Sequence, residues 1–315
     1  MNKVKVGVVG IGHLGSYHLQ KYQNLPNSEV VGVADIVEER AQKAAIAYDC
    51  DAYTDYRKLI GTVDAVSITV PTGYHYLIAK AFLVAGVDVL LEKPIAQTLA
   101  EADELVTIAE GENLIFQVGF VERFNPAVVA LKTVMGEPLF IEAHRLHPFF
   151  ERGTDVDVIL DLMIHDLDII LSFVKSSVRD VEAVGVPVLS DKVDIANARL
   201  TFGSGCVANI TASRISNKVL QKIRFFEREG YHAVDYEKRE LVSLARKNMA
   251  REQIEITQNQ VEVKIQDPLE EEIRSFLKAV TDRTSPTVSG REGMASLELA
   301  LQIMEKIRTA REPVL

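Results

Sequence analysis

The sequence predicts an α/β protein with two domains: an N-terminal Rossmann-type, doubly wound parallel sheet and a C-terminal α+β domain built on a large, mostly antiparallel sheet. Three observations support this prediction. The first 122 residues alternate short Val- and Ile-rich runs with helical patterns. A glycine-rich turn joins the first strand to the first helix. Beyond residue 123, longer strands follow one another across short turns.

Length and composition indicate the number of domains, the class of protein and the kind of partner. A chain of 315 residues exceeds the size at which one core stops growing, so we expect a dinucleotide-binding domain over 1–122 and a substrate-binding, oligomerising domain over 123–315. With 47% hydrophobic and 25% charged residues, the chain has the composition of a folded globular protein. The net charge of -10 disfavours a nucleic-acid partner, which requires clustered Lys and Arg.

The cysteines and the N-terminus bear on location. Cys50 and Cys206 form no CxxC pair, so neither a disulfide framework nor a thiolate zinc site is expected, and a reducing cytoplasm fits best. The N-terminal run "KVKVGVVG" lacks the features of a leader peptide, and no uncharged apolar run is long enough to span a membrane.

The elements of the N-terminal domain follow in a regular order. Nearly continuous β-branched runs indicate strands that are buried on both faces. The expected strands are 4–10, 29–35, 65–70, 88–94 and 114–120, and the expected helices are 13–25, 38–49, 74–86 and 99–111.

The C-terminal domain has longer strands that only partly alternate, which favours an antiparallel or mixed sheet. Its expected strands are 139–147, 178–189, 193–213, 218–229 and 231–245, and helices are expected around 158–171 and at 269–282 and 292–309.

The first turn has the form of a dinucleotide-binding loop. Gly10, Gly12 and Gly15 in "VVGIGHLGSYH" give G-x-G-x-x-G between a strand and a helix. The first glycine permits the tight turn, the second lets the backbone approach a pyrophosphate, and the third allows close packing of helix on strand. We expect this loop, including His13 and Leu14, to contact the cofactor.

The next strand ends in Asp35, 20 residues after Gly15, where an acid takes the ribose hydroxyls. Its carboxylate repels a 2'-phosphate, so NAD is expected as the cofactor rather than NADP. The simpler interpretation is that Asp35 only caps the helix that follows.

Several further motifs resemble one known family. Glu92-Lys93-Pro94 follows a buried strand, "GFVERFNP" comes after the last parallel strand, and Asp161 and His165 lie four residues apart in "VILDLMIHDLDIIL". In this order they resemble the glucose-fructose oxidoreductase and inositol dehydrogenase family of nicotinamide-dependent oxidoreductases, over essentially the whole chain.

The resemblance implies roles for these residues. In that family the equivalents of Lys93, Asp161 and His165 meet over the nicotinamide, so these three are the expected catalytic residues. The turns after two of the parallel strands line the cofactor. Further expected cofactor contacts are Thr69, Pro71, His75, Glu92 and Lys93 itself.

A helical projection from Ile159 agrees with a cleft-facing pair. At ~100° per residue, Asp161, His165 and Asp168 fall together on a stripe without Lys, Arg or Glu, opposite a face that includes Leu162. Asp166 falls on the apolar side, for which the pattern offers no reason beyond a buried hydrogen bond.

These residue types suit alcohol oxidation. His165 titrates near neutrality and is the natural base for a hydroxyl proton, while the Lys93 ammonium stabilises developing negative charge and Asp161 orients the imidazole. A metal site is the weaker alternative, because zinc would need a further ligand such as His144 or His147. No metal is therefore expected.

The substrate class comes from the resemblance as well. "GFVERFNPAV" and "RGTDVDVILDLMIHDLDI" look like the branch that oxidises UDP-linked N-acetylamino sugars, particularly at the 3-hydroxyl of UDP-N-acetylglucosamine. Expected substrate contacts are Arg123, Asn125 and His165, and Arg145 and Arg152 are further candidates for the diphosphate. A free sugar or inositol, an unsaturated or imine substrate for reduction, and a non-catalytic NAD-binding regulator stay open.

Oligomerisation is expected through the C-terminal sheet. One face of an antiparallel sheet would be bare, and we expect apolar residues on it that a second copy covers, giving a homodimer or homotetramer. The apolar residues expected there are Val207, Ile210, Val219 and Ile223.

Overall fold

The computed structural model describes residues 3–149, 156–248 and 254–311, which fall into two compact units. Each unit is made of two segments of the chain. The first unit combines the residues up to Val121 with Asp267–Ala295, and the second combines Glu122–Gln266 with the residues from Ser296 onward. None of the described helices has the length and apolarity needed to cross a bilayer.

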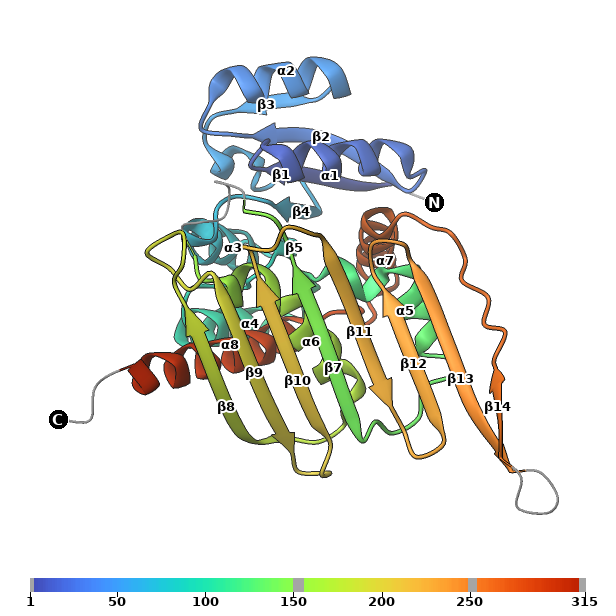
Figure 1. Cartoon of the computed structure of the whole chain (residues 1–315). Helices are drawn as coiled ribbons and strands as arrows, with labels where there is room; N and C mark the ends of the chain where they lie inside the picture. Colours follow the sequence, from blue (N-terminus) through green and yellow to red (C-terminus); the bar gives the residue numbers. More distant parts are fainter. Residues whose placement is uncertain (1–2, 150–155, 249–253, 312–315) are drawn as a thin grey trace. The chain divides into compact units, whose positions relative to one another are not determined.

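The first unit contains the doubly wound parallel sheet that the sequence predicts. Its six strands lie in the order β3-β2-β1-β4-β5-β6, every neighbouring pair is parallel, and the order changes direction at β1 (Figure 1). The strands are β1 Val4–Val9, β2 Ser28–Ala34, β3 Asp51–Tyr53, β4 Ala65–Ile68, β5 Asp88–Glu92 and β6 Phe116–Gly119. The helices are α1 His13–Asn24, α2 Glu38–Tyr48, η1 Tyr56–Leu59, η2 Thr72–Tyr74, α3 His75–Val84, α4 Leu99–Gly111 and α7 Pro268–Asp282.

Helix α7 explains why the chain returns to this unit. Its residues Ile273, Phe276 and Leu277 are fully buried in the same apolar core as Val6 of β1 and Leu19 of α1. The expected division into 1–122 and 123–315 follows the order of the chain, whereas the core groups α7 with the first sheet. An amphipathic helix shows which of its faces is buried, but its pattern does not identify the core that buries it.

The second unit is built on an eight-stranded sheet in the order β14-β13-β12-β11-β7-β10-β9-β8. All its pairs are antiparallel except β7 with β10, which is parallel, so the expected mostly antiparallel sheet is confirmed. The strands are β7 Phe140–Leu146, β8 Val178–Val186, β9 Ile195–Phe202, β10 Val207–Ser213, β11 Leu220–Phe226, β12 Gly230–Asp235, β13 Glu240–Asn248 and β14 Ile254–Gln258. The helices are η3 Val121–Phe124, α5 Pro126–Leu131, η4 Ile159–Met163, α6 Ile164–Phe173 and α8 Gly290–Arg311; η3 and α8 each run across the boundary between the units.

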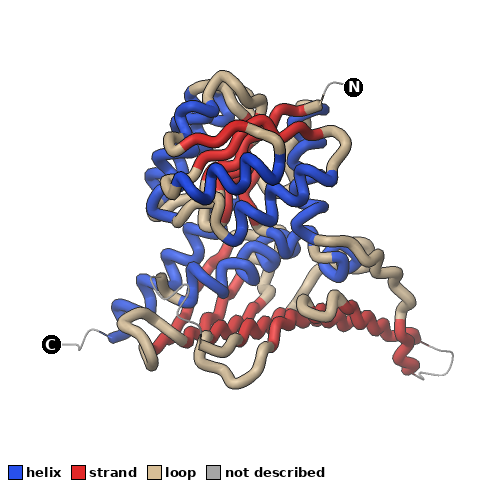
Figure 2. The backbone as a smooth tube through the Cα atoms, turned by 90° about the horizontal axis from the view of Figure 1, so that it is seen from above, coloured by secondary structure: helices blue, strands red, loops and turns tan. Residues whose placement is uncertain are grey.

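The two faces of the large sheet differ in polarity. Figure 2 shows the sheet edge-on, with loops but no described helix on its lower side. The sequence analysis expected Ile210 and Ile223 on the open face, and this was wrong: both are completely buried and lie on the covered face. The open face carries polar and apolar side chains together: Asn197 and Glu142 lie on it, as does Val184, which is 60% exposed.

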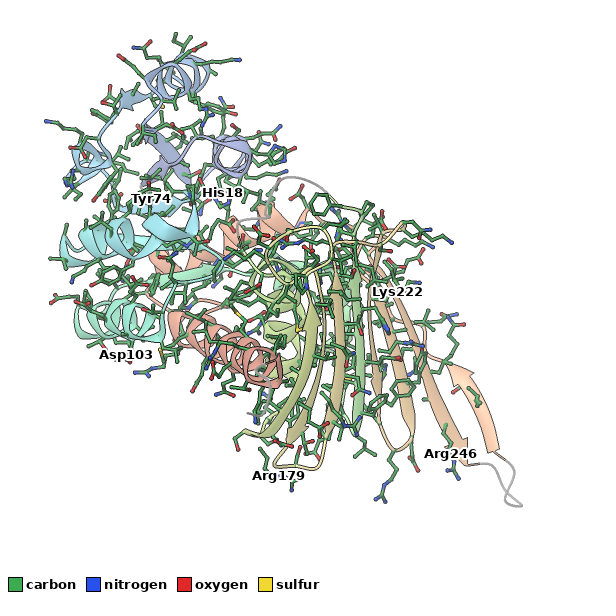
Figure 3. All side chains as sticks on the ribbon, turned by 60° about the vertical axis from the view of Figure 1, so that its left-hand side comes forward. His18, Tyr74, Asp103, Arg179, Lys222 and Arg246 are labelled. Carbon is green, nitrogen blue, oxygen red and sulfur yellow. The ribbon has the colours of Figure 1, made fainter. Side chains whose placement is uncertain are left out.

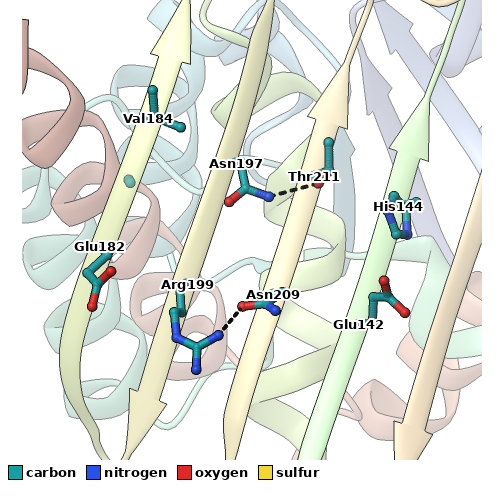
Figure 4. Close-up of a pocket in the computed structure, with 9 residues that line it drawn as sticks. Glu142, His144, Glu182, Val184, Asn197, Arg199, Asn209 and Thr211 are labelled. Carbon is teal, nitrogen blue, oxygen red and sulfur yellow. Dashed lines mark hydrogen bonds between the residues drawn. The ribbon is translucent and has the colours of Figure 1, made fainter.

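Polar side chains line a depression on this open face. It has a volume of about 570 Å³, and Figure 4 shows Glu142 and His144 of β7 beside residues of β8, β9 and β10. Arg199 of β9 donates to Asn209 of β10 at 3.0 Å. Of the four apolar residues expected on this face, Ile210 and Ile223 lie on the other one, whereas Val207 is half-buried and Val219 is 41% exposed.

Candidate active site

The glycine loop has the geometry that a bound pyrophosphate requires. Gly10 adopts φ +91°, a conformation that favours glycine, and its N–H donates to Ala34 O at 2.8 Å. The Thr69 hydroxyl donates to Gly10 O at 2.6 Å, which ties the turn after β4 to the loop. Gly12 caps α1 without a side-chain hydrogen bond, and a Cβ at this position would meet no atom within 4 Å. The helix N-terminus is therefore open to an anion.

Asp35 lies directly after β2 and is 7% exposed. Its Oδ2 accepts the Ile11 N–H at 2.7 Å, and its Oδ1 accepts the Val37 N–H at 2.8 Å. The N-cap of α2 is Val37, without a side-chain hydrogen bond, so Asp35 does not cap this helix as the simpler interpretation held. Its carboxylate instead fixes the turn before α2 and lies against the glycine loop. Together with the open helix end, this arrangement fits the pyrophosphate and ribose of NAD.

Gly15 offers a direct test of the loop. A Cβ there would lie 2.0 Å from Gly10 O and 2.8 Å from Thr69 Oγ1, so Gly15→Ala must displace either the loop or α1. We expect NAD affinity to fall at least tenfold, about 1.4 kcal/mol, in isothermal titration calorimetry. Gly111→Ala in α4, where a Cβ meets nothing within 4 Å, is the matched control. Unchanged NAD affinity in Gly15→Ala would contradict this role of the loop.

The turns after β4 and β5 are held together by His75. Its imidazole is 1% exposed, with Nδ1 2.8 Å from Pro94 O and Nε2 2.8 Å from Val70 O. Burial lowers the pKa of His75, although the two carbonyl contacts oppose the shift. The structure therefore gives His75 the task of joining two turns, while Pro71, expected to contact the cofactor, is exposed at the start of η2.

Glu92 is the last residue of β5 and Lys93 follows it in the turn, and both are half-buried. The Lys93–Pro94 peptide is cis. Downstream, α4 begins with a reciprocal capping box, in which the Thr98 side chain accepts from Glu101 N and the Glu101 carboxylate accepts from Thr98 N. Lys93 is thus presented by a short turn between a buried strand and a well-capped helix.

Asp161 and His165 belong to the second unit. Asp161 lies in η4, a π-helical turn, and His165 lies at the start of α6, and both side chains are half-buried. Because the π-helical turn is wider than an α-helical one, a projection at 100° per residue does not hold across it. Leu162 is accordingly half-exposed rather than buried. Asp168 lies in α6 together with His165 and is 1% exposed because it pairs with Arg123.

Asp166, unexplained by the sequence pattern, forms a buried ion pair. The Arg145 guanidinium donates to both of its carboxylate oxygens, at 2.9 and 3.1 Å, and to Glu122 at 3.1 Å. Although burial alone disfavours the charged guanidinium, these two carboxylates raise the pKa of Arg145 above its ordinary value. The guanidinium also stacks 4.7 Å from the Tyr236 ring centroid.

The expected substrate contacts have structural partners. Arg123 is 5% exposed and donates to Asp168 at 2.7 Å. Asn125 is 2% exposed, caps α5 by accepting from Ala127 N, and donates to Tyr236 O at 3.0 Å. Arg152 lies outside the described residues. The contacts of Arg123 and Asn125 with a substrate stay a prediction.

These contacts disfavour a metal site at His165. Asp166 and Asp168, the aspartates nearest to His165 in the chain, are committed to Arg145 and Arg123. Within the described part of the chain, the group with metal-ligand spacing is a different one, formed by His18, Glu92 and Glu272 in the first unit. The sequence analysis did not single out His18, although it lies three residues after Gly15.

Comparison with known proteins relates both units to one family. Residues 4–120 match the model of an oxidoreductase family with an NAD-binding Rossmann fold, and residues 130–231 match the GFO/IDH/MocA C-terminal domain. The UDP-N-acetylglucosamine 3-dehydrogenase of Acidithiobacillus ferrooxidans is 37% identical over 96% of this chain and 97% of its own length.

Solved structures agree with these relationships. A structure of that same Acidithiobacillus ferrooxidans enzyme aligns with a TM-score of 0.90 at 36% identity, over 98% of this chain and 99% of the other. Levoglucosan dehydrogenase in complex with NADH aligns with a TM-score of 0.87 at 21% identity, over 98% of both chains, which shows the shared fold. A myo-inositol 2-dehydrogenase of Thermotoga maritima is 25% identical over 98% of this chain and 97% of its own.

Proposed function

The chain belongs to the GFO/IDH/MocA family of NAD-binding oxidoreductases, and we propose that it oxidises a secondary hydroxyl of a sugar nucleotide, the 3-hydroxyl of UDP-N-acetylglucosamine. As a member of this family it is an NAD-dependent dehydrogenase that acts on a CH–OH group. The observation that carries the proposed substrate is the 37% identity, over nearly the full length of both chains, to a dehydrogenase of that sugar nucleotide.

We propose a separate role in alcohol oxidation for each of the three catalytic residues. When bound, NAD accepts a hydride from the carbon that bears the hydroxyl. His165 takes the hydroxyl proton, and Asp161, four residues earlier, orients its imidazole. The Lys93 ammonium stabilises the negative charge that develops on the oxygen. These assignments rest on the motifs around the three residues and on the half-buried positions of their side chains.

The cofactor contacts are proposed from the loop geometry. The amides at the start of α1, around Gly12, His13 and Leu14, are suited to the pyrophosphate, and the Asp35 carboxylate is suited to the ribose. Thr69 and Glu92 hold the neighbouring turns.

The function is tested by incubating the protein with NAD and either UDP-N-acetylglucosamine or myo-inositol while NADH absorbance is followed. An aminotransferase is added to remove the keto product, because such oxidations are unfavourable. We expect turnover with the nucleotide sugar. Turnover of inositol with none of any nucleotide sugar would leave the dehydrogenase mechanism intact and refute the substrate. A protein that binds NAD but turns over neither compound would instead favour a regulator.

Cofactor preference gives an independent prediction. If the Asp35 carboxylate faces the ribose as proposed, it repels a 2'-phosphate, and NAD(H) should bind at least tenfold more tightly than NADP(H), about 1.4 kcal/mol. Asp35→Ser should reduce this preference, whereas Glu38→Gln, at an exposed acid of α2, should not. Calorimetry that gives equal affinities for the two cofactors in the wild type would contradict it.

We further propose that copies of this chain associate through the open face of the large sheet. Besides exposed apolar residues such as Val184, this face carries a partly exposed ion pair between Glu142 and Arg224. Arg199 lines the same depression as Glu142. Charges of both signs suit a two-fold contact between identical faces. Light scattering of the wild type and of Arg199→Glu would show whether the face holds copies together.

A further inference from the structure

A buried chain of polar groups runs behind the turn that presents Lys93. His18 of α1, labelled in Figure 3, is completely buried, and its Nδ1 lies 3.2 Å from Ser67 Oγ of β4. The same Ser67 oxygen lies 2.7 Å from the Tyr22 hydroxyl, one helical turn further along α1. Buried side chains of this kind are costly unless each finds a partner.

The other imidazole nitrogen reaches Glu92. His18 Nε2 lies 3.2 Å from Glu92 Oε1, and Glu92 immediately precedes Lys93. The backbone of β6 leaves a fitted space for this carboxylate, because a Cβ at Gly119 would lie 3.1 to 3.2 Å from its Cδ and both oxygens. The carboxylate is therefore held from one side by His18 and confined on the other by Gly119.

One arrangement of hydrogens satisfies the whole chain. With the hydrogen on Nε2, His18 donates to a Glu92 oxygen and its Nδ1 accepts from the Ser67 hydroxyl, whose oxygen accepts from the Tyr22 hydroxyl. Burial raises the pKa of Tyr22, which keeps its phenol protonated and able to donate. In this arrangement each group donates to the next, from Tyr22 through Ser67 and His18 to Glu92, and the hydrogen bonds hold the Glu92 carboxylate in place.

We propose that His18 is a positioning residue that holds the Glu92 carboxylate and thereby sets the turn that presents Lys93. This inference rests on the proposed function, in which Lys93 acts on the substrate oxygen. His18 itself touches neither substrate nor cofactor in this role. Its loss should lower the rate of the chemical step through a misplaced Lys93 and leave NAD binding largely intact.

The same atoms raise one competing interpretation. Glu272 of α7 is completely buried, and one oxygen of its carboxylate, one of Glu92 and one His18 nitrogen lie within 4.8 Å of one another. This spacing suits a metal ion as well as a hydrogen-bonded chain. A metal held there would be seen as zinc or manganese that copurifies with the wild-type protein in elemental analysis and is absent from His18→Leu, and that result would overturn the positioning role.

The kinetic experiment compares two substitutions at one position. His18→Leu removes both nitrogens at similar volume, whereas His18→Gln keeps an amide N–H that can reach Glu92. We expect kcat of His18→Leu to fall about 10²-fold, with NAD affinity near wild type, and His18→Gln to stay within about tenfold of wild type. His232→Leu, at a buried histidine of β12 beside Glu227, is the matched control, with unchanged kcat even if the melting temperature falls.

A double-mutant cycle with Lys93→Ala separates the two proposals. If His18 acts through Lys93, His18→Leu should lower kcat less than about threefold further in the Lys93→Ala background. Full activity of Lys93→Ala would refute the proposed catalytic role of Lys93. A large loss in Lys93→Ala with fully additive effects of the two substitutions would leave that role standing and overturn the positioning role of His18. Equal losses in His18→Leu and His18→Gln would overturn it as well.

Discussion

Replacing His165 by alanine should lower turnover roughly 10²- to 10⁴-fold while NAD affinity stays near that of the wild type. The reason is the proposed role of the imidazole as the base that accepts the hydroxyl proton. The measurement is steady-state kinetics with the nucleotide sugar, combined with calorimetry of NAD binding.

His144→Ala is the matched control, since this half-buried histidine lies on the open face of the large sheet. It should retain turnover within about twofold of wild type. Thermal melting of both variants distinguishes a chemical from a structural role. If His165→Ala lost stability without a specific loss of turnover, or if a chelator abolished activity and added metal restored it, the assignment of His165 as the base would be wrong.

The largest expected effect on stability is at Asp166. Asp166→Ala leaves the Arg145 guanidinium, 3% exposed, with a desolvated charge that Glu122 alone offsets. We expect the free energy of unfolding to fall by about 3–5 kcal/mol, the cost of breaking one side of a buried pair. Urea denaturation followed by circular dichroism measures it.

Two further variants identify the source of that effect. The double variant Arg145→Met with Asp166→Leu removes both charges and should recover most of the lost stability. Arg274→Met breaks an exposed pair with Glu270 on α7 and should cost about 1 kcal/mol or less. An Asp166→Ala cost no larger than that of Arg274→Met would show that the buried pair does not stabilise the unit.

The differences between sequence and structure share one cause. The motif "VILDLMIHDLDIIL" correctly marked a helical segment, and His165 is half-buried in it. The partners of its neighbours were not visible, because Arg145 lies 21 residues before Asp166 and Arg123 lies 45 residues before Asp168. A periodicity argument separates polar from apolar faces, and it does not foresee an aspartate that is buried because an arginine from another element meets it.

The sequence alone determined the parallel sheet of the first unit, the glycine loop and the acid after the second strand. These follow from local rules: β-branched runs form buried strands, and G-x-G-x-x-G is needed where backbone must approach an anion. Tertiary structure decided what depends on contacts between distant segments. Helix α7 packs in the core of the first unit, and Ile210 and Ile223 lie on the covered face of the large sheet. His18 contacts Glu92, which comes 74 residues later in the chain. Packing is decided by which surfaces meet, and that information is spread over the whole chain rather than over any one motif.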